Sequence, residues 1–284
     1  MFRIVLTIII SILGFAAFAN TISGIVVDEN GECLPYSTIR IMHKPIATLG
    51  DAYGCFTIKS ESINQSDTLS ITYIGYEPMK LAVNGLNADS TQTFKLQPAT
   101  NLLNEITVNQ KQKGKRKTVS KGKKHSWSLL KTNICGKTAG DTYGYEFHAK
   151  KNKKLFLDKV GFYYCEGDKQ MTKMNFRINI YDMSNVKSEP TRNFINVLTE
   201  PIVFEYQLGD TASGKFEYTL PEQMVLPDDA MVEIEFLENL DDEIFWFKSN
   251  LIGGKSWSKL FLENIWVKTP FSTPFFIECV EFDQ

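Results

Sequence analysis

The sequence of 284 residues is poor in the residue types and motifs from which catalytic centres and metal sites are most often built. It has three histidines, His43, His125 and His148, and none has a Glu three residues after it, so the ligand spacing of a zinc peptidase is missing. A Gly-x-Ser-x-Gly motif, a His-Glu-x-x-His motif and a Rossmann glycine fingerprint are missing as well. We therefore predict that the protein is not an enzyme and has no catalytic residue, no metal and no cofactor; a hydrolase whose site is assembled from scattered carboxylates is the alternative.

Cysteine is also scarce, and its number is odd. The five positions are Cys33, Cys55, Cys135, Cys165 and Cys279. No Cys-x-x-Cys pair occurs, which argues against a zinc knuckle or a thioredoxin-type site, and an odd count in a chain of this length is not a disulfide scaffold. Cys33 follows a turn at Gly31 and Cys55 follows a turn at Gly54, so we expect the two thiols at one edge of the same domain. We predict a disulfide between Cys33 and Cys55, worth about 3 kcal/mol in the chain-entropy model; two free thiols are the alternative.

Long apolar runs are missing everywhere except at the N-terminus. Residues 1–19 have the three parts of a signal peptide: a basic residue, Arg3, an apolar core from Ile4 to Phe15, and an Ala-Phe-Ala cleavage site at 17–19. An uncleaved anchor is the alternative, although this apolar core is short for a membrane span. We predict a mature protein that begins at Asn20 and is exported to the periplasm, or is associated with the outer membrane or the cell surface.

Acidic residues are missing from residues 109–124, which contain eight Lys or Arg, one aliphatic residue and no aromatic residue. Such a segment buries too little apolar surface to offset the entropy lost on ordering. We predict a flexible basic linker here, between a domain at 20–108 and a domain at 125–284. Because the linker has no aromatic residue for stacking, we expect no nucleic acid as a partner. A solvated spacer and a contact with anionic lipid or lipopolysaccharide are the two interpretations.

Residues 20–108 alternate apolar and polar residues in short runs that end in turn residues, which is typical of β-strands. The clearest runs are 22–28, 37–43, 67–76, 93–96 and 106–108. In the second run Ile39 and Ile41 share a face, and in the third Leu69 and Ile71 do so. No segment here has helical periodicity over three turns, so we predict a small β-sandwich.

Several of these turn and strand residues occur together in a known family. They are Gly24 to Asp28, Gly31, Leu34-Pro35, Gly50-Asp51 with Gly54-Cys55-Phe56, Thr68 to Tyr76, and Leu103 to Val108. Together they resemble the carboxypeptidase regulatory-like domain of Bacteroidota. The resemblance covers residues 21–108 and implies a seven-stranded, transthyretin-like sandwich with no catalytic residues of its own.

Residues 125–284 show stronger alternation. The best run places Met174, Phe176, Ile178 and Ile180 on one face and the polar or aromatic residues between them on the other. Glu233 and Glu235 alternate with apolar residues in a later run. The number of short strands predicts a two-sheet, jelly-roll-like sandwich. Residues 144–147, 159–163 and 176–181 resemble the C-terminal part of uncharacterised Bacteroidota proteins that carry the same first domain, and this resemblance implies no activity.

All four tryptophans lie in this second half: Trp127, Trp246, Trp257 and Trp266. Aromatic side chains on a β-sandwich can stack on sugars, and they can equally fill the core. We take Trp246, Trp257 and Trp266 as candidate binding residues. Acidic clusters at 228–229 and 241–243 follow no EF-hand pattern, so we interpret them as solvated turns and not as calcium sites.

Taken together, these features predict a non-enzymatic, exported cell-envelope protein that binds or scaffolds an unknown envelope protein or glycan. A glycan-binding module is one alternative, based on the tryptophans. An accessory protein to TonB-dependent outer-membrane transport is another, and it follows only from the resemblance of the first domain.

Overall fold

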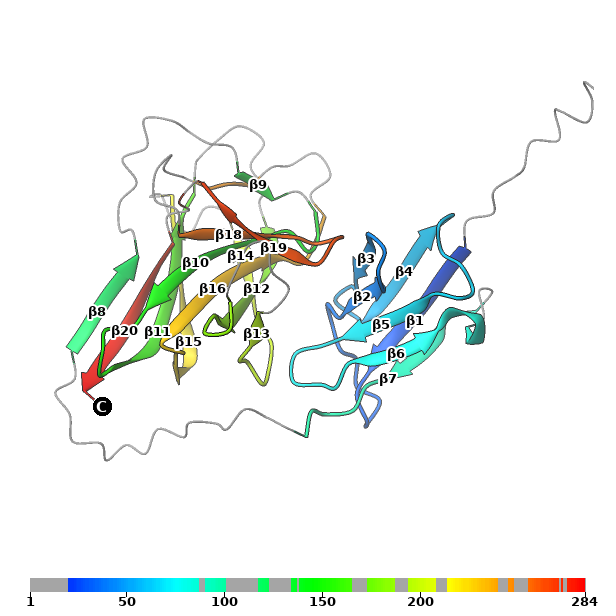
Figure 1. The fold of residues 1–284 in the computed structure, drawn as a ribbon, viewed down its shortest axis with the longest axis horizontal. Helices are drawn as coiled ribbons and strands as arrows, with labels where there is room; N and C mark the ends of the chain where they lie inside the picture. Colours follow the sequence, from blue (N-terminus) through cyan, green and yellow to red (C-terminus); the bar gives the residue numbers. More distant parts are fainter. Residues whose placement is uncertain are drawn as a thin grey trace, which may run out of the picture.

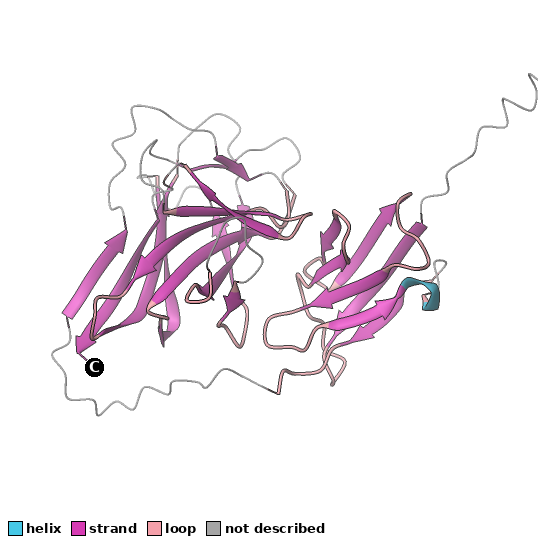
Figure 2. Cartoon of the chain, viewed as in Figure 1, coloured by secondary structure: helices cyan, strands magenta, loops and turns pink. Residues whose placement is uncertain are grey.

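The computed structural model describes residues 20–86, 90–100, 117–122, 134–136, 138–164, 173–186, 194–207, 214–239, 245–247, 255–270, 272 and 275–283. These residues form two β-sandwiches, so the all-β fold class is confirmed (Figures 1 and 2). The expected signal peptide, the run at 106–108 and the first part of the basic linker lie outside the described residues. No helix in the described part of the chain is both long and apolar enough to cross a membrane.

The first sandwich contains a three-stranded and a four-stranded sheet, which agrees with the expected seven strands. The three-stranded sheet has the order β4 (Cys55–Ser60), β1 (Asn20–Val27), β7 (Gln92–Lys95). The four-stranded sheet has the order β3 (Ile46–Leu49), β2 (Thr38–Ile41), β5 (Thr68–Thr72), β6 (Met79–Ala82). A short 3-10 turn, Val83–Gly85, follows β6.

The core of the first sandwich is the apolar face that the alternation predicts. Ile39, Ile41, Leu69 and Ile71 are fully buried between the two sheets. Gly24 on β1 lies directly against the ring of Phe94 on β7, and a side chain at this position would overlap that ring. The close packing of β1 on the Phe94 ring therefore requires glycine at position 24.

The predicted disulfide between Cys33 and Cys55 is not formed. Cys55 pairs with Ile25 and Cys33 bridges to Val27, so the two residues do lie along one edge of β1, as expected. Both thiols are nevertheless free and exposed. The turn signals predicted the neighbourhood correctly, but they did not fix the relative position of the two side chains, and that position decides whether a disulfide forms.

The second sandwich has two main sheets, which agrees with the jelly-roll-like prediction. The larger sheet has the order β13 (Ile195–Asn196), β12 (Lys173–Asp182), β16 (Asp229–Phe236), β10 (Thr142–His148), β18 (Ser256–Leu260), β19 (Ile265–Thr269), and β14 (Ile202–Gln207) also pairs with β12. The smaller sheet has the order β15 (Lys215–Val225), β11 (Lys153–Tyr163), β20 (Phe275–Asp283), β8 (Lys117–Gly122). A separate pair joins β9 (Ile134–Gly136) to β17 (Phe245–Phe247).

The facing surfaces of these two sheets form an aromatic core. Phe176 of β12 contacts Phe162 of β11, Phe204 of β14 and Phe236 of β16. The alternation at 174–180 is confirmed, because Met174, Phe176, Ile178 and Ile180 are all fully buried in this core.

One boundary of the expected linker needs correction. Residues 117–122, predicted to be part of the flexible segment, form β8, which pairs antiparallel with β20. The composition argument counted only the apolar area of the side chains. It missed that a basic segment at a sheet edge can satisfy its backbone N–H and C=O groups by pairing. Lys121 adds a hydrogen bond of 3.1 Å from its ammonium to the carbonyl of His148.

Candidate functional site: a buried polar face on the second sandwich

The larger sheet of the second sandwich has an unusual outer face. Because side chains alternate along a strand, the residues between the core positions of β12 and β16 point away from the aromatic core. They are Arg177, Asn179 and Tyr181 on β12 and Glu233 and Glu235 on β16. Such positions are normally solvated, whereas here each retains at most 6% of its accessible surface. The sheet therefore has a second buried face, and this one is polar.

Aromatic rings cover one end of this face. Trp257 on β18, Trp266 on β19 and Phe194 pack with Tyr181 and Met231 in a buried cluster. Phe194 meets both indole rings edge to face, with centroid distances of 5.2 Å and 5.1 Å. The rings exclude water from that end of the polar face, which strengthens the electrostatic interactions beneath them.

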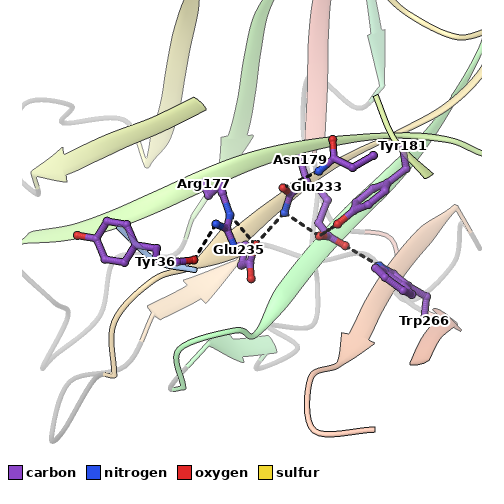
Figure 3. A network of polar contacts seen from close by, with 8 residues as sticks. Tyr36, Arg177, Asn179, Tyr181, Glu233, Glu235 and Trp266 are labelled. Carbon is purple, nitrogen blue, oxygen red and sulfur yellow. Dashed lines mark hydrogen bonds and ion pairs between the residues drawn. The ribbon is translucent and has the colours of Figure 1, made fainter. Parts of the chain in front are cut away.

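Arg177 and Glu235 form a buried ion pair at the end of the polar face next to Tyr36 (Figure 3). The guanidinium donates from Nε and Nη2 to Glu235 Oε2 at 2.9 Å and 2.8 Å. Asn179 donates from Nδ2 to the same oxygen at 2.9 Å. Burial acts to raise the pKa of Glu235, but Arg177, the nearby Lys259 and the hydrogen bonds outweigh it, so this pKa lies below its usual value. Glu235 is therefore held as a carboxylate.

Glu233, two residues earlier on β16, has a different environment (Figure 3). It accepts hydrogen bonds from the Tyr181 hydroxyl at 3.2 Å and from Trp266 Nε1 at 3.0 Å. No ion pair to Glu233 occurs among the described residues. Burial raises the pKa of Glu233; the charge of Lys259 opposes this shift, and the negative charge of Glu235 adds to it. Two carboxyl groups on one strand are therefore placed in opposite electrostatic environments.

A second polar cluster lies nearer the N-terminal end of β16. Glu146 on β10 accepts hydrogen bonds from Trp257 Nε1 at 2.7 Å and from Lys268 Nζ at 2.7 Å. Its neighbour His148 contacts Asp229 through Nδ1 at 2.8 Å. Burial acts to raise the pKa of Glu146, but the contacts with Lys268 and Trp257 lower it below its usual value.

The first sandwich lies against the other end of the polar face (Figure 1). Arg177 donates from Nη1 to the backbone carbonyl of Tyr36 at 3.0 Å. In the opposite direction, Arg40 on β2 donates to the carbonyls of Phe261 and Leu262, in the turn between β18 and β19, and its guanidinium lies 5.4 Å from the centroid of the Phe261 ring. Tyr36 and Leu49 of the first sandwich share a buried apolar cluster with Leu237 and Phe261 of the second.

A cavity of about 280 Å³ lies between the two sandwiches. From the first sandwich, Thr38, Thr72 and residues 73–75 line it. From the second, it is lined by residues of the polar face and its border: Arg177, Asn179, Tyr181, Asn196, Leu198, Glu235 and Lys259. The polar face therefore opens into a space that has one wall from each domain. This cavity is the candidate site.

The tryptophans proposed from the sequence as binding residues do not form an exposed surface where the structure describes them. Trp257 and Trp266 retain 2% and 5% of their accessible surface, so neither presents an open face for stacking on a sugar, and the prediction of a tryptophan-based surface is corrected for these two. The sequence pattern around Trp257 and Trp266 predicted short strands. It did not show that the hairpin formed by β18 and β19 lies over the polar face. The side chain of Trp246, Trp127 and the acidic cluster at 241–243 lie outside the described residues. Among the described residues, no group of His, Cys, Asp and Glu is arranged to hold a metal ion.

The residues that sequence reasoning missed are those of the polar face. Their alternation with the core positions was visible, but it predicts a solvated face in an ordinary sandwich. A signal did exist: Arg, Asn and Tyr on one strand and two Glu on another are hydrogen-bonding residues in matched positions. Only the pairing of β12 with β16, which sets Arg177 opposite Glu235 and Asn179 opposite Glu233, shows that they meet.

Comparison with known proteins identifies the first sandwich. Residues 22–108 match the family model of the CarboxypepD_reg-like domain, which confirms the resemblance over that part of the chain. No curated protein matches the sequence.

Proposed function

We propose that the protein is a non-enzymatic, exported binding protein of the cell envelope, and that its binding site is the polar face of the second sandwich with the cavity that the first sandwich closes over it. The observation that carries this proposal is the burial of Arg177, Glu233 and Glu235 on the outer face of a sheet that borders a cavity.

The physical argument starts from the cost of burying charge. A buried ion pair is often no more stable than a well-packed apolar pair of the same size, because desolvation offsets the attraction. The second sandwich already has an extensive aromatic core between its sheets. A second buried face made of charged groups is therefore not needed for folding, and buried groups with shifted pKa values that border a cavity are typical of functional sites.

The arrangement favours binding over catalysis. Glu235 accepts hydrogen bonds from Arg177 and Asn179, while Glu233 accepts them from Tyr181 and Trp266. These contacts fix the side chains in place and leave neither carboxyl group poised beside a nucleophile. The CarboxypepD_reg-like domain is a regulatory, non-catalytic fold, and a role as one wall of a binding site is consistent with it.

Binding to envelope material tests the proposal. The tagged mature chain, starting at Asn20, is incubated with detergent-solubilised envelope extract, and the retained proteins and glycans are quantified by mass spectrometry and carbohydrate analysis. The test variant is Arg177→Met/Glu235→Met, which removes both charges together and replaces two polar side chains of the cavity wall with apolar ones. The control is Lys173→Met, on the same strand β12, whose side chain is 59% exposed.

We expect material that wild type and the control retain in equal amounts and that the double variant loses. The nature of this material, protein or glycan, identifies the partner class. Retention of the same material in the same amounts by wild type and the double variant would contradict the proposal.

A further inference from the structure

The cavity has hydrogen-bonding groups that the protein itself does not use. Arg177 and Asn179 donate hydrogen bonds to Glu235 Oε2, and Arg177 also donates to the Tyr36 carbonyl. The hydroxyl groups of Thr38, Thr72 and Tyr73, on the opposite wall, make no hydrogen bond to another residue in the described part of the chain. One wall of the cavity therefore has a network of bonded polar groups, and the opposite wall has spare hydroxyl groups.

Lys259 is the cation of the cavity whose ammonium has no hydrogen-bond partner among the described residues. It lies on β18, is half-buried, and borders the cavity next to Glu235. Its ammonium lies 4.6 Å from the centroid of the Trp266 ring and 6.0 Å from that of Phe261. Its ammonium is in no ion pair or hydrogen bond with a described residue, although an ammonium has three donors, and Glu235 and Glu233 act on it only through longer-range attraction. The two rings shield the Lys259 ammonium from solvent on one side. A hydrogen-bond acceptor therefore binds the ammonium most strongly from the side that faces the cavity.

The charges of the network set the charge of the ligand. Arg177 is matched by Glu235 through two hydrogen bonds, so it is not available to a second anion. Lys259 is then the cation whose donors remain open to the cavity, and the carboxyl groups of Glu235 and Glu233 act on it as well. One open ammonium beside two carboxyl groups favours a ligand with a single negative charge, a carboxylate, over a doubly charged phosphate. The cavity volume of about 280 Å³ is near the lower end of the range of ligand pockets, about 300–1,000 Å³, so the ligand is small.

We propose that the cavity binds a small, hydroxyl-bearing ligand that carries one carboxylate, with the carboxylate on Lys259 and its hydroxyl groups on Thr38, Thr72 and Tyr73. This inference rests on the proposed function, since it names the ligand class of the same site. An acidic monosaccharide has the required chemistry, and it would enter either as a free sugar or as the end of an envelope glycan.

The test uses the full mature chain and follows the indole N–H signal of Trp266 by NMR, because this ring lies beside the Lys259 ammonium. The probes are glucuronate, glucose and acetate. Glucose matches glucuronate without the charge, and acetate supplies the charge without the hydroxyl groups. Lys259→Met removes the ammonium, Lys259→Arg keeps a cation, and Lys255→Met is the control because Lys255 is exposed just before the same strand.

We expect glucuronate to shift the Trp266 signal saturably, acetate to do so at higher concentration, and glucose to leave it unchanged. Lys259→Met should weaken the apparent affinity for glucuronate by about tenfold or more, because a hydrogen bond to a charged group is lost. Lys259→Arg should retain part of the binding and Lys255→Met all of it.

Two results would overturn the inference: no shift with either carboxylate, or an equal shift in wild type and Lys259→Met. If the envelope material is still lost in Arg177→Met/Glu235→Met, such a result removes only the carboxylate assignment. If that double variant retains all the envelope material, the proposed function itself fails. The two failures are therefore distinguishable.

Discussion

Replacing Arg177 alone tests whether the ion pair of the polar face is as isolated from solvent as its burial indicates. In Arg177→Met the Glu235 carboxylate loses two hydrogen bonds and its ion-pair partner, and the Tyr36 carbonyl loses the Arg177 donor. Removing one partner of a buried pair leaves an uncompensated charge, which costs about 3–5 kcal/mol in the free energy of unfolding.

This loss in the free energy of unfolding is large enough to be measured by urea denaturation. All four tryptophans lie within residues 125–284, so the tryptophan fluorescence in urea of a chain that begins at Asn20 follows the second sandwich. With a denaturant slope of about 2 kcal/mol per molar urea, a loss of 3–5 kcal/mol lowers the urea midpoint by about 1.5–2.5 M.

Two matched variants separate desolvation from the loss of a side chain. Lys173→Met breaks the exposed Lys173–Glu205 pair on the same strand, so it should cost less than about 1 kcal/mol. Arg177→Met/Glu235→Met removes both buried charges, while Asn179 keeps its hydrogen bond of 3.2 Å to Glu233. This double variant should lie within about 1 kcal/mol of wild type. If Arg177→Met costs no more than Lys173→Met, the pair is solvated and our reading of the polar face is wrong.

Three further predictions concern other parts of the chain. Gly24→Ala should destabilise the first sandwich by about 1–3 kcal/mol in thermal unfolding, because its methyl group overlaps the Phe94 ring, and Gly24→Ala/Phe94→Leu should recover part of the loss; an unchanged midpoint would show that β1 is not tightly packed on β7. The folded-state pKa of Glu146 is lowered, so its contribution to stability is present at neutral pH and disappears as the pH falls through that folded-state pKa; Glu146→Gln should flatten the acid limb of a stability–pH curve, and an unaltered limb would argue against the Lys268 contact. Iodoacetamide at pH 8 should modify Cys33 and Cys55 in the folded protein but modify Cys279 only in denaturant, because Cys279 is buried and its pKa is raised to about 12; rapid labelling of Cys279 in the folded protein would show that β20 is not packed as described.

Much of the fold could be predicted because period-2 alternation reports which face of a strand is buried. The runs with Ile39, Leu69 and Phe176 are strands whose apolar side lies in a core. The strands β3 and β6 were missed: they are the two edge strands of their sheet, and most of their residues are only partly buried, so they lack a clear buried face. Strand β8 was missed for a different reason: its pairing with β20 depends on an edge far away in the sequence.

The site could not be predicted from the sequence because it depends on three-dimensional pairing. Alternation places Arg177 and Glu235 on outer faces, but it does not show that their strands are neighbours in register. It also gives no information on what covers an outer face. Here the cover comes from the β18–β19 hairpin, which contains Trp266, and from the first sandwich, which contributes Tyr36. The tryptophans that the sequence offered as a binding surface are part of this cover.

The central claim is that both sandwiches form one binding site, and Arg40→Ala tests it most directly. This change removes the contacts from β2 to the carbonyls of Phe261 and Leu262 without altering the polar face. Lys80→Ala, at an exposed position on β6 of the same sheet, is the control.

The measurement is the amount of envelope material retained by each variant, with hydrogen exchange of residues 255–262 as a check that the contact has opened. We predict that Arg40→Ala exchanges faster there and retains severalfold less material, while Lys80→Ala matches wild type. Faster exchange in Arg40→Ala together with wild-type retention would show that the first sandwich is not a wall of the site.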